Sequence, residues 1–237
     1  RDFTINAIYA DLHGRIFDPV NGMLDLKKGI IKFIGPSEER IQEDYLRILR
    51  FFRFFIQYSK IEYEQDIISS IKKNINGINK ISNERIFDEL KKILSLPNIY
   101  KLFSNKISQE IILNIFPQFI YYERLKVFNE LDKNIKAMHD NDLVLALLIV
   151  DQTNAYEYFC HKYKTSNNIK KRFKNISKNY ESLKNNNFYL ENNIKKLVYL
   201  LGKSEVIDLL LLSIYINKKV KNLDIKKLII FVNNCEV

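Results

Sequence analysis

The sequence of 237 residues has few of the residues that interrupt helices or cross-link chains: six glycines, four prolines and two cysteines, with no tryptophan. Because glycine and proline mark turns and end helices, their scarcity predicts a mostly helical chain. Two cysteines exclude a disulfide framework and favour a reducing compartment, which we expect to be the cytoplasm. The longest apolar run, residues 143–150, is far shorter than the ~18 residues that span a bilayer, so no membrane partner is expected.

Positive charge exceeds negative charge, with 38 Lys and Arg against 28 Asp and Glu and a formal net charge of +10. An excess of this size favours an anionic partner, nucleic acid or phosphate, although a basic surface also serves solubility alone. Hydrophobic residues make up 46% of the chain, which is enough to bury a core and excludes disorder throughout.

The first 36 residues differ in pattern from the rest of the chain. They hold four of the six glycines, and short apolar runs at 8–10 and 15–17 flank a turn at 11–14, which predicts a β-hairpin. A third β-like run covers residues 30–34. From residue 37 onward the apolar residues follow helical spacing. We therefore predict a mainly α fold, in which a short α/β segment precedes an elongated all-helical region.

Polar residues mark the starts of several expected helices. Ser37 fits the N-cap of a helix that runs through about Tyr58, and Ser82 fits the N-cap of another that runs to about Leu94. The only D-x-D sequence, at 140–142, directly precedes the apolar run. We interpret it as helix capping rather than metal binding.

The segment 43–56 combines charged and aromatic residues. Its charged members recur every three residues, which on a helix places them on nearly one face: Asp44, Arg47, Arg50 and Arg53. Spacing alone favours an ordinary solvated face. The four phenylalanines of this segment argue instead that the helix is largely buried, so part of the charged ridge is expected to border a cleft.

A carboxylate next to a guanidinium can distinguish nucleobases. Cytosine and adenine each present an amino donor beside a ring-nitrogen acceptor, which an Asp44 acceptor and Arg47 donors would satisfy. Uracil and guanine present a carbonyl and a ring N–H at these positions. They would leave buried groups unpaired, at ~1–3 kcal/mol each.

Four short motifs follow one another along the chain: RDFTINA at 1–7, DPVNGMLDL at 18–26, EDYLRILR at 43–50 and SNERIFDEL at 82–90. In this order they resemble motifs of the class II tRNA nucleotidyltransferases (CCA-adding enzymes) and bacterial poly(A) polymerases. The family patterns are R-R-D-F-T-I-N-A, D-P-x-x-G-x-x-D-L, the nucleotide-template motif E-D-x-x-R-x-x-R and the neck motif S-x-E-R-I-x-x-E-L. The resemblance covers residues 1 to about 95, and the remainder matches only as helical body and tail.

The resemblance implies roles for individual residues. Asp44 and Arg47 would form the protein template for ATP and CTP, with Glu43 holding Arg47 in place. Arg50 would face the triphosphate. Three residues of the neck motif would brace the neck helices: Ser82, Arg85 and Glu89. In the first motif, two further residues would contact the incoming nucleotide, with the second of them at the ribose: Arg1 and Asp2.

The resemblance also implies a domain plan and a cofactor. Residues 1–36 would be the remnant of a nucleotidyltransferase head, 37–115 the neck with the nucleotide template and an RNA-binding region, and 116–237 the body and tail that bind tRNA. The family's catalytic carboxylates precede the R-R-D motif, and this sequence begins at Arg1. We therefore expect Mg²⁺ in the complete enzyme, held by ligands outside this chain. A separate head segment is an expected partner, and the chain alone is expected to be inactive.

These observations predict the C-terminal portion of a template-independent RNA nucleotidyltransferase that adds CCA, or part of it, to tRNA 3′ ends. Two alternatives stay open. A poly(A) polymerase shares every motif found here, and a non-catalytic RNA-binding module would account for the missing carboxylates. For RNA we expect contacts from basic residues of the tail, although a solvated helix face fits them equally well: Lys170, Lys171, Arg172, Lys174, Lys195 and Lys196.

Overall fold

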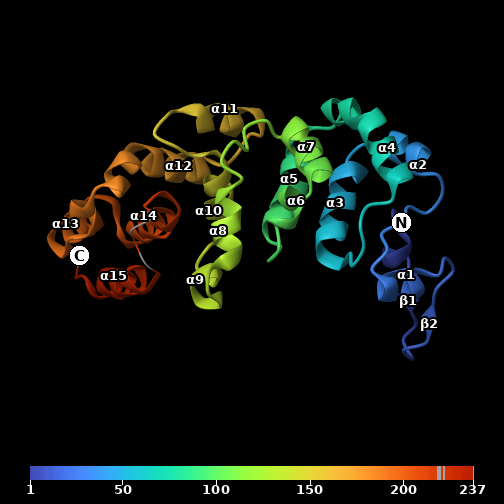
Figure 1. The fold of residues 1–237 in the computed structure, drawn as a ribbon, viewed down its shortest axis with the longest axis horizontal. Helices are drawn as coiled ribbons and strands as arrows, with labels where there is room; N and C mark the ends of the chain where they lie inside the picture. The colour runs from blue at the N-terminus through green and yellow to red at the C-terminus, as the bar shows by residue number, and fades with distance from the viewer. Residues whose placement is uncertain (218–219, 221, 237) are drawn as a thin grey trace. The chain divides into compact units, whose positions relative to one another are not determined.

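The computed structural model describes residues 1–217, 220 and 222–236. The chain divides into two compact units, Arg1–Pro117 and Gln118–Val237, each of which is described by itself (Figure 1). Within the described residues, helices dominate and the one sheet has two strands, which confirms the predicted mainly α fold. The described part of the chain contains no helix with the length and apolar character needed to cross a membrane.

The first unit begins with the predicted hairpin. Strands β1 (Tyr9–Ala10) and β2 (Ile16–Phe17) pair in antiparallel register, with Tyr9 opposite Phe17. The β-like run at 30–34 adds only an isolated bridge between Phe33 and Phe3. The other elements of this unit are η1 (Thr4–Asn6), α1 (Gly22–Lys28), α2 (Ser37–Glu43), α3 (Arg47–Tyr58), α4 (Gln65–Asn74), η2 (Ile75–Lys80), α5 (Asn83–Leu94), α6 (Lys101–Ser104) and α7 (Lys106–Ile115).

The prediction of one helix from Ser37 to about Tyr58 is wrong. The chain leaves the helix at Asp44, whose backbone is extended (φ −154°, ψ 102°). The Asp44 side chain accepts a hydrogen bond from the amide of Leu46 at 3.2 Å, and such local side chain–backbone bonds compete with helix continuation. The helical conformation resumes at Arg47 as α3. Asp44 therefore lies in a turn between two helices and not on the helix of Arg47.

The predicted helix caps have mixed outcomes. The Ser82 side chain accepts from the backbone amide of Arg85 and caps α5, as expected. Ser37 is the first residue of α2 rather than its cap, which is Pro36. In the D-x-D sequence, Asp140 is the N-cap of α10 (Asn141–Ile149), where it accepts from the Leu143 amide at 2.8 Å. The capping interpretation of this sequence is thus confirmed.

Aromatic packing joins the first residues of the chain to α3. Phe51 is fully buried in α3, with ring centroids 6.4 Å from Phe3 and 6.1 Å from Phe33. Burial of each such side chain contributes roughly 1.5–3 kcal/mol. Because Phe3 follows Asp2 directly, this packing places the Asp2 carboxylate against the polar side of α3.

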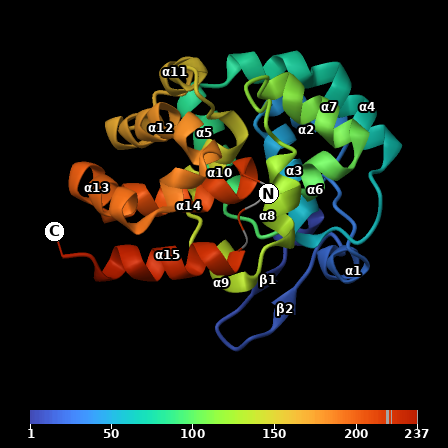
Figure 2. The same ribbon diagram turned by 60° about the vertical axis from the view of Figure 1, so that its left-hand side comes forward.

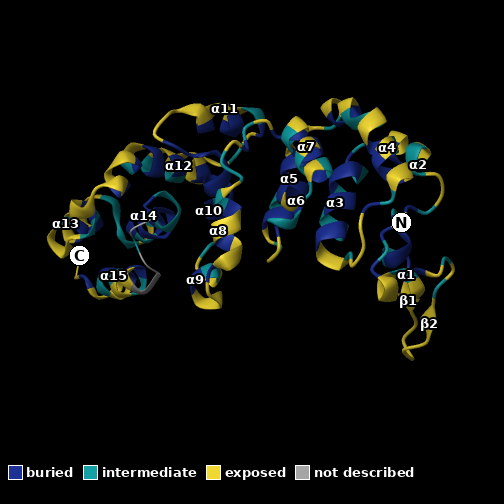
Figure 3. Ribbon diagram, in the orientation of Figure 1, coloured by how far each residue is buried: buried dark blue, intermediate teal, exposed yellow. Residues whose placement is uncertain are grey.

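The second unit is built around two helices that are apolar on nearly all sides. These are α10 and α14 (Lys203–Ile216), and both are largely buried (Figure 3), as expected for helices without a polar face. Helix α14 packs against α12, α13 and α15 (Figure 2), and also against the 3₁₀ helix η3. The remaining elements are α8 (Arg124–Glu130), α9 (Lys133–Ala137), α11 (Ala155–Lys162), α12 (Asn167–Asn179), η3 (Glu181–Lys184), η4 (Asn186–Tyr189), α13 (Glu191–Leu201) and α15 (Asn222–Asn234).

Candidate nucleotide-binding site

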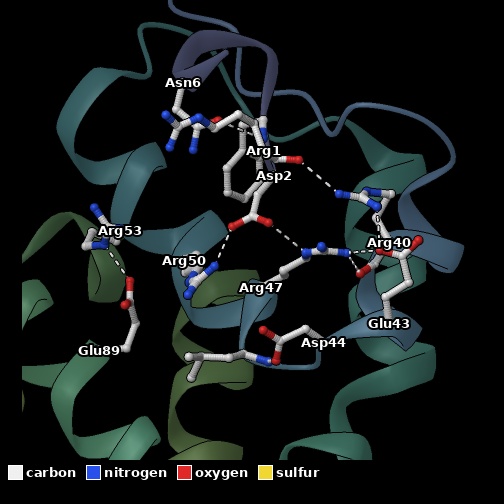
Figure 4. Close-up of polar contacts among 12 residues, drawn as sticks. Arg1, Asp2, Asn6, Arg40, Glu43, Asp44, Arg47, Arg50, Arg53 and Glu89 are labelled. Atoms are coloured by element: carbon white, nitrogen blue, oxygen red, sulfur yellow. Dashed lines mark hydrogen bonds and ion pairs between the residues drawn. The ribbon is translucent and has the colours of Figure 1, made fainter.

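Asp2 lies at the centre of a charged cluster in the first unit (Figure 4). Its Oδ1 accepts from Nε of Arg47 at 2.8 Å, and its Oδ2 accepts from Nη1 of Arg50 at 2.6 Å. The side chains of Asp2 and Arg47 are each only 13% exposed. Burial alone would raise the pKa of Asp2, but the hydrogen bonds from Arg50 and Arg47 outweigh it and hold this pKa below its ordinary value. The carboxylate is therefore ionised at neutral pH and fixes both arginines.

Arg47 is held from a second side by α2. Its Nη1 donates to Oε2 of Glu43 at 2.6 Å and also to the backbone carbonyl of Arg40. Partial burial would lower the pKa of Arg47, but Glu43 and Asp2 raise it above its ordinary value. The expected contact between Glu43 and Arg47 is thus present. Among the described residues no hydrogen bond engages Nη2 of Arg47, so the two N–H donors of this nitrogen are left for a ligand.

Arg40 completes the cluster and was not anticipated from the sequence. Its guanidinium donates to Glu43 and, at 2.9 Å, to the backbone carbonyl of Arg1. Hydrogen bonds from Arg47 and Arg40 lower the pKa of the Glu43 carboxyl. The Arg1 guanidinium lies over the Tyr9 ring, 5.8 Å from its centroid. Five of the six predicted nucleotide-binding residues therefore share one network: Arg1, Asp2, Glu43, Arg47 and Arg50.

Asp44, the sixth predicted residue, has a different partner. Its Oδ2 accepts from Nη2 of Arg85 at 2.8 Å, and its side chain is 22% exposed. Arg85 comes from the first turn of α5, so this contact joins two segments that are far apart in the sequence. Arg85 therefore braces the chain by binding the Asp44 carboxylate. The sequence pattern did not reveal that Asp44 is its partner.

Arg53, the last member of the predicted ridge, lies outside the Asp2 network. It pairs with Glu89 of α5, whose side chain is only 1% exposed. Oε2 of Glu89 also accepts a hydrogen bond from Nζ of Lys92 at 3.2 Å. This pairing of α3 with α5 confirms the expectation that Glu89 braces the helices.

The cluster offers donors and acceptors suited to a nucleotide. The fixed guanidiniums of Arg47 and Arg50 can bind a base edge or a phosphate, and the Asp44 carboxylate can accept from an amino group. It does not suit a metal ion, because both oxygens of Asp2 already bind arginines. Within the described residues, no group of three or more His, Cys, Asp or Glu side chains could hold a metal.

The predicted RNA-contacting residues lie in the second unit and fall into two classes. Five lysines are exposed on the outer faces of α12 and α13: Lys170, Lys171, Lys174, Lys195 and Lys196. Arg172 differs, because it is bidentate to Asp208 at 2.6 and 2.7 Å and binds Asp140 at 2.7 Å. These ion pairs raise the pKa of Arg172 although burial opposes them. Arg172 therefore joins α12 to α14 and α10, and its contact with RNA stays a prediction.

Two family models match parts of the chain. Residues 1–32 match a model described as the poly A polymerase head domain, and residues 61–122 match one described as the probable RNA and SrmB-binding site of polymerase A. The CCA-adding enzyme of Staphylococcus haemolyticus is 31% identical over 214 residues, 90% of this chain and 50% of that protein. The mitochondrial CCA tRNA nucleotidyltransferase 1 of Mus musculus is 36% identical over 152 residues, 61% of this chain and 33% of that protein. The chain thus spans half or less of the length of these curated relatives.

Solved structures show the same fold. A Thermotoga maritima CCA-adding enzyme complexed with tRNA aligns over 100% of this chain and 60% of its own, with a TM-score of 0.69 and 20% identity. A CCA-adding enzyme complexed with ATP aligns over 99% of this chain and 59% of its own, with a TM-score of 0.71 and 23% identity. At these identities the likeness concerns the fold.

Proposed function

The chain belongs to the class II family of CCA-adding enzymes and poly(A) polymerases, and from this premise we propose that it is the nucleotide-selecting and RNA-binding part of a tRNA nucleotidyltransferase. The complete enzyme would add CCA, or part of it, to tRNA 3′ ends. One observation carries the proposal. Asp2 and Glu43 fix Arg47, which follows Asp44 by three residues, and leave both N–H donors of its Nη2 without a partner among the described residues.

Base selection follows from the chemistry of these two side chains. Nη2 of Arg47 would donate to the ring nitrogen of cytosine or adenine, and Asp44 would accept from the exocyclic amino group. Uracil and guanine would place a carbonyl against the carboxylate and an N–H against the guanidinium. Each mismatch would cost ~1–3 kcal/mol. CTP and ATP are therefore the proposed nucleotides.

The remaining residues of the cluster have supporting roles in this proposal. Arg50 would bind the triphosphate, and Arg1 would contact the nucleotide beside it. Asp2 would position Arg47 and Arg50, which bind its two oxygens, and the remaining lone pairs of its carboxylate would accept from the ribose.

A head segment outside this sequence would supply the metal ligands. Large apolar side chains are exposed on β1, β2 and α1, at 44–65% of their surface: Tyr9, Ile16, Phe17, Met23 and Leu24. Exposed apolar groups of this kind mark interaction sites, and we propose that they pack against the rest of a nucleotidyltransferase head. Mg²⁺ would be bound there and would stabilise charge during nucleotidyl transfer. Cys160 and Cys235 are both free thiols, in keeping with the cytoplasm as the proposed location.

The second unit is the proposed tRNA-binding part. It holds 20 Lys and Arg against 13 Asp and Glu, and so carries +7 of the net charge of +10. The exposed lysines of α12 and α13 would bind phosphates. Neutralising three of them should weaken tRNA binding regardless of sequence. It should also flatten the log–log salt dependence of binding by roughly 0.7–0.9 for each phosphate that is no longer neutralised.

The test is reconstitution. The chain is combined with a head segment from a CCA-adding relative and given Mg²⁺, CTP, ATP and a tRNA that lacks its CCA end. We expect extension that depends on CTP and ATP. Long A tracts without incorporation of C would instead identify a poly(A) polymerase. tRNA binding without any extension would favour the non-catalytic module and would refute the enzymatic proposal.

A further inference from the structure

The outer face of α13 carries an exposed aromatic residue between basic neighbours. Helix α13 turns Ile194 and Val198 into the core, so the positions on the opposite side are exposed. Tyr199 is 80% exposed and Leu200 is 72% exposed. This exposed face consists of Asn192, Lys195, Lys196, Tyr199 and Leu200, and we refer to it as the α13 face.

The three principal side chains of the α13 face do not hold other parts of the fold in place. Among the described residues, Lys195 and Lys196 have no ion-pair partner and Tyr199 has no ring partner. Two other lysines of this unit form ion pairs, Lys184 with Glu181 at 2.7 Å and Lys226 with Asp132 at 3.0 Å. An exposed ring three and four residues from two unpaired cations leaves a π face and positive charge directed at solvent.

We propose that the α13 face binds an unpaired base of a folded RNA. Tyr199 stacks on the base, and Lys195 and Lys196 bind the phosphates beside it. This inference rests on the proposed function, in which the second unit binds tRNA, and it adds the site and the part of the RNA that occupies it. RNA is favoured over a protein partner because it carries negative charge throughout, whereas the α13 face has two unpaired cations and the unit as a whole has a positive net charge.

The geometry of RNA restricts the occupant further. In an A-form duplex each base is covered on both faces by its neighbours, and only loops, bulges and ends present a free base face. Tyr199 should therefore contribute to the binding of a looped RNA and not to that of a blunt duplex. The two lysines should contribute to both, since both RNAs carry the same phosphates.

The test compares variants of the full chain on two RNAs, a tRNA transcript and a blunt-ended RNA duplex. Loss of base stacking in Tyr199→Ala should weaken tRNA binding by about five-fold or more and leave duplex binding unchanged, and Tyr199→Phe should keep the affinity of the parent chain. Tyr158 provides the matched control, because it is 63% exposed in the same unit but follows an acidic residue, Glu157. Tyr158→Ala should bind both RNAs like the parent chain.

The salt dependence separates stacking from charge. Replacing Lys195 and Lys196 by alanine should reduce the log–log salt slope on both RNAs by roughly 0.7–0.9 for each lysine that binds a phosphate, whereas Tyr199→Ala should leave the slope unchanged. If the parent chain binds tRNA and Tyr199→Ala binds it equally well, the inference is overturned and the proposed function stands. If the parent chain binds neither RNA, both fail. A Tyr199→Ala variant that loses self-association in sedimentation, with unchanged RNA binding, would make the α13 face a protein contact and would also overturn the inference.

Discussion

Replacing Asp2 by asparagine removes the charge that holds Arg47 and Arg50 while it keeps the size of the side chain. In the native chain the two oxygens of Asp2 accept from these arginines at 2.8 and 2.6 Å. An asparagine can accept from one arginine, but its amide nitrogen then faces the other. The variant therefore loses one charge-assisted hydrogen bond outright and weakens the second.

The expected loss follows from the exposure of the partners. A broken buried ion pair costs about 3–5 kcal/mol, and an exposed pair contributes about 0–1 kcal/mol. Arg47 is 13% exposed and Arg50 is 31% exposed. The loss in free energy of unfolding for Asp2→Asn should therefore lie between these limits, at roughly 2–3 kcal/mol. For a unit of 117 residues, an unfolding entropy of about 0.25 kcal/mol per degree converts this loss into a Tm that is lower by about 8–12 °C.

The assay is thermal unfolding of both chains, followed by circular dichroism at several pH values. Asp88→Asn is the matched control, because Asp88 forms a pair with Lys91 in which the side chains are 64% and 43% exposed. Because both side chains are exposed, Asp88→Asn should leave the thermal melt unchanged.

The pH dependence of unfolding shows whether the negative charge of Asp2 causes the difference in stability between the two chains. The pKa of Asp2 is lowered from 3.8 in the folded chain, so its contribution is complete above about pH 4 and disappears as the pH falls through the lower folded value. The difference between the parent chain and Asp2→Asn should close over that acidic range. A difference below about 1 kcal/mol at neutral pH, or one that stays constant in acid, would refute the assignment of Asp2 as the anchor of the two arginines.

Two further predictions concern the second unit. Arg172→Met should destabilise the chain by roughly 3 kcal/mol, because it leaves Asp208 as an unpaired charge with an 11% exposed side chain. The control variant, Lys171→Ala, should leave the thermal melt unchanged. Equal melting temperatures for the two variants would exclude a structural role for Arg172. Burial lowers the pKa of His139 from 6.5, although Ile135 and Asp140 oppose the shift, and its Nε2 lies 2.9 Å from the Tyr215 hydroxyl. The free energy of unfolding should therefore fall as the pH drops below about 6.5, and His139→Gln should remove this fall in urea titrations at pH 5 and pH 7.

Local patterns in the sequence predicted the features that depend on neighbouring residues. The hairpin follows from alternation around a turn, and the Ser82 cap follows from one side chain and an amide three residues later. The contact between Glu43 and Arg47 was implied by the family motif. Its spacing of four residues survives the helix break, because the turn at 44–46 brings α2 and α3 close together.

The break itself could not be predicted from hydrophobic periodicity. The leucines and phenylalanines of 46–56 continue the helical spacing of the preceding segment, but the chain leaves the helix at Asp44, whose side chain binds the Leu46 amide. Propensity is a weak guide where one local hydrogen bond competes with the helix.

Contacts between distant segments were also beyond the sequence. Arg85 reaches Asp44 across 41 positions, Arg50 reaches Asp2 across 48 and Arg172 reaches Asp208 across 36. No spacing rule connects residues this far apart, because the packing of whole helices decides which charges meet. As a result, Arg172 looked like another exposed cation, and Arg85 looked like a general brace.

The measurement that most directly tests the central claim is the nucleotide preference of Asp44 and Arg47 variants in the reconstituted enzyme. Incorporation of CTP, ATP, UTP and GTP is compared for the parent chain, Asp44→Ala and Arg47→Ala, with thermal melts recorded alongside. The account predicts that each variant loses ~1–3 kcal/mol of discrimination against UTP and GTP, about 5- to 150-fold in relative incorporation. Variants that melt at lower temperature but keep the preference for CTP and ATP would show that the two residues only stabilise the fold, and would contradict the proposed base selection.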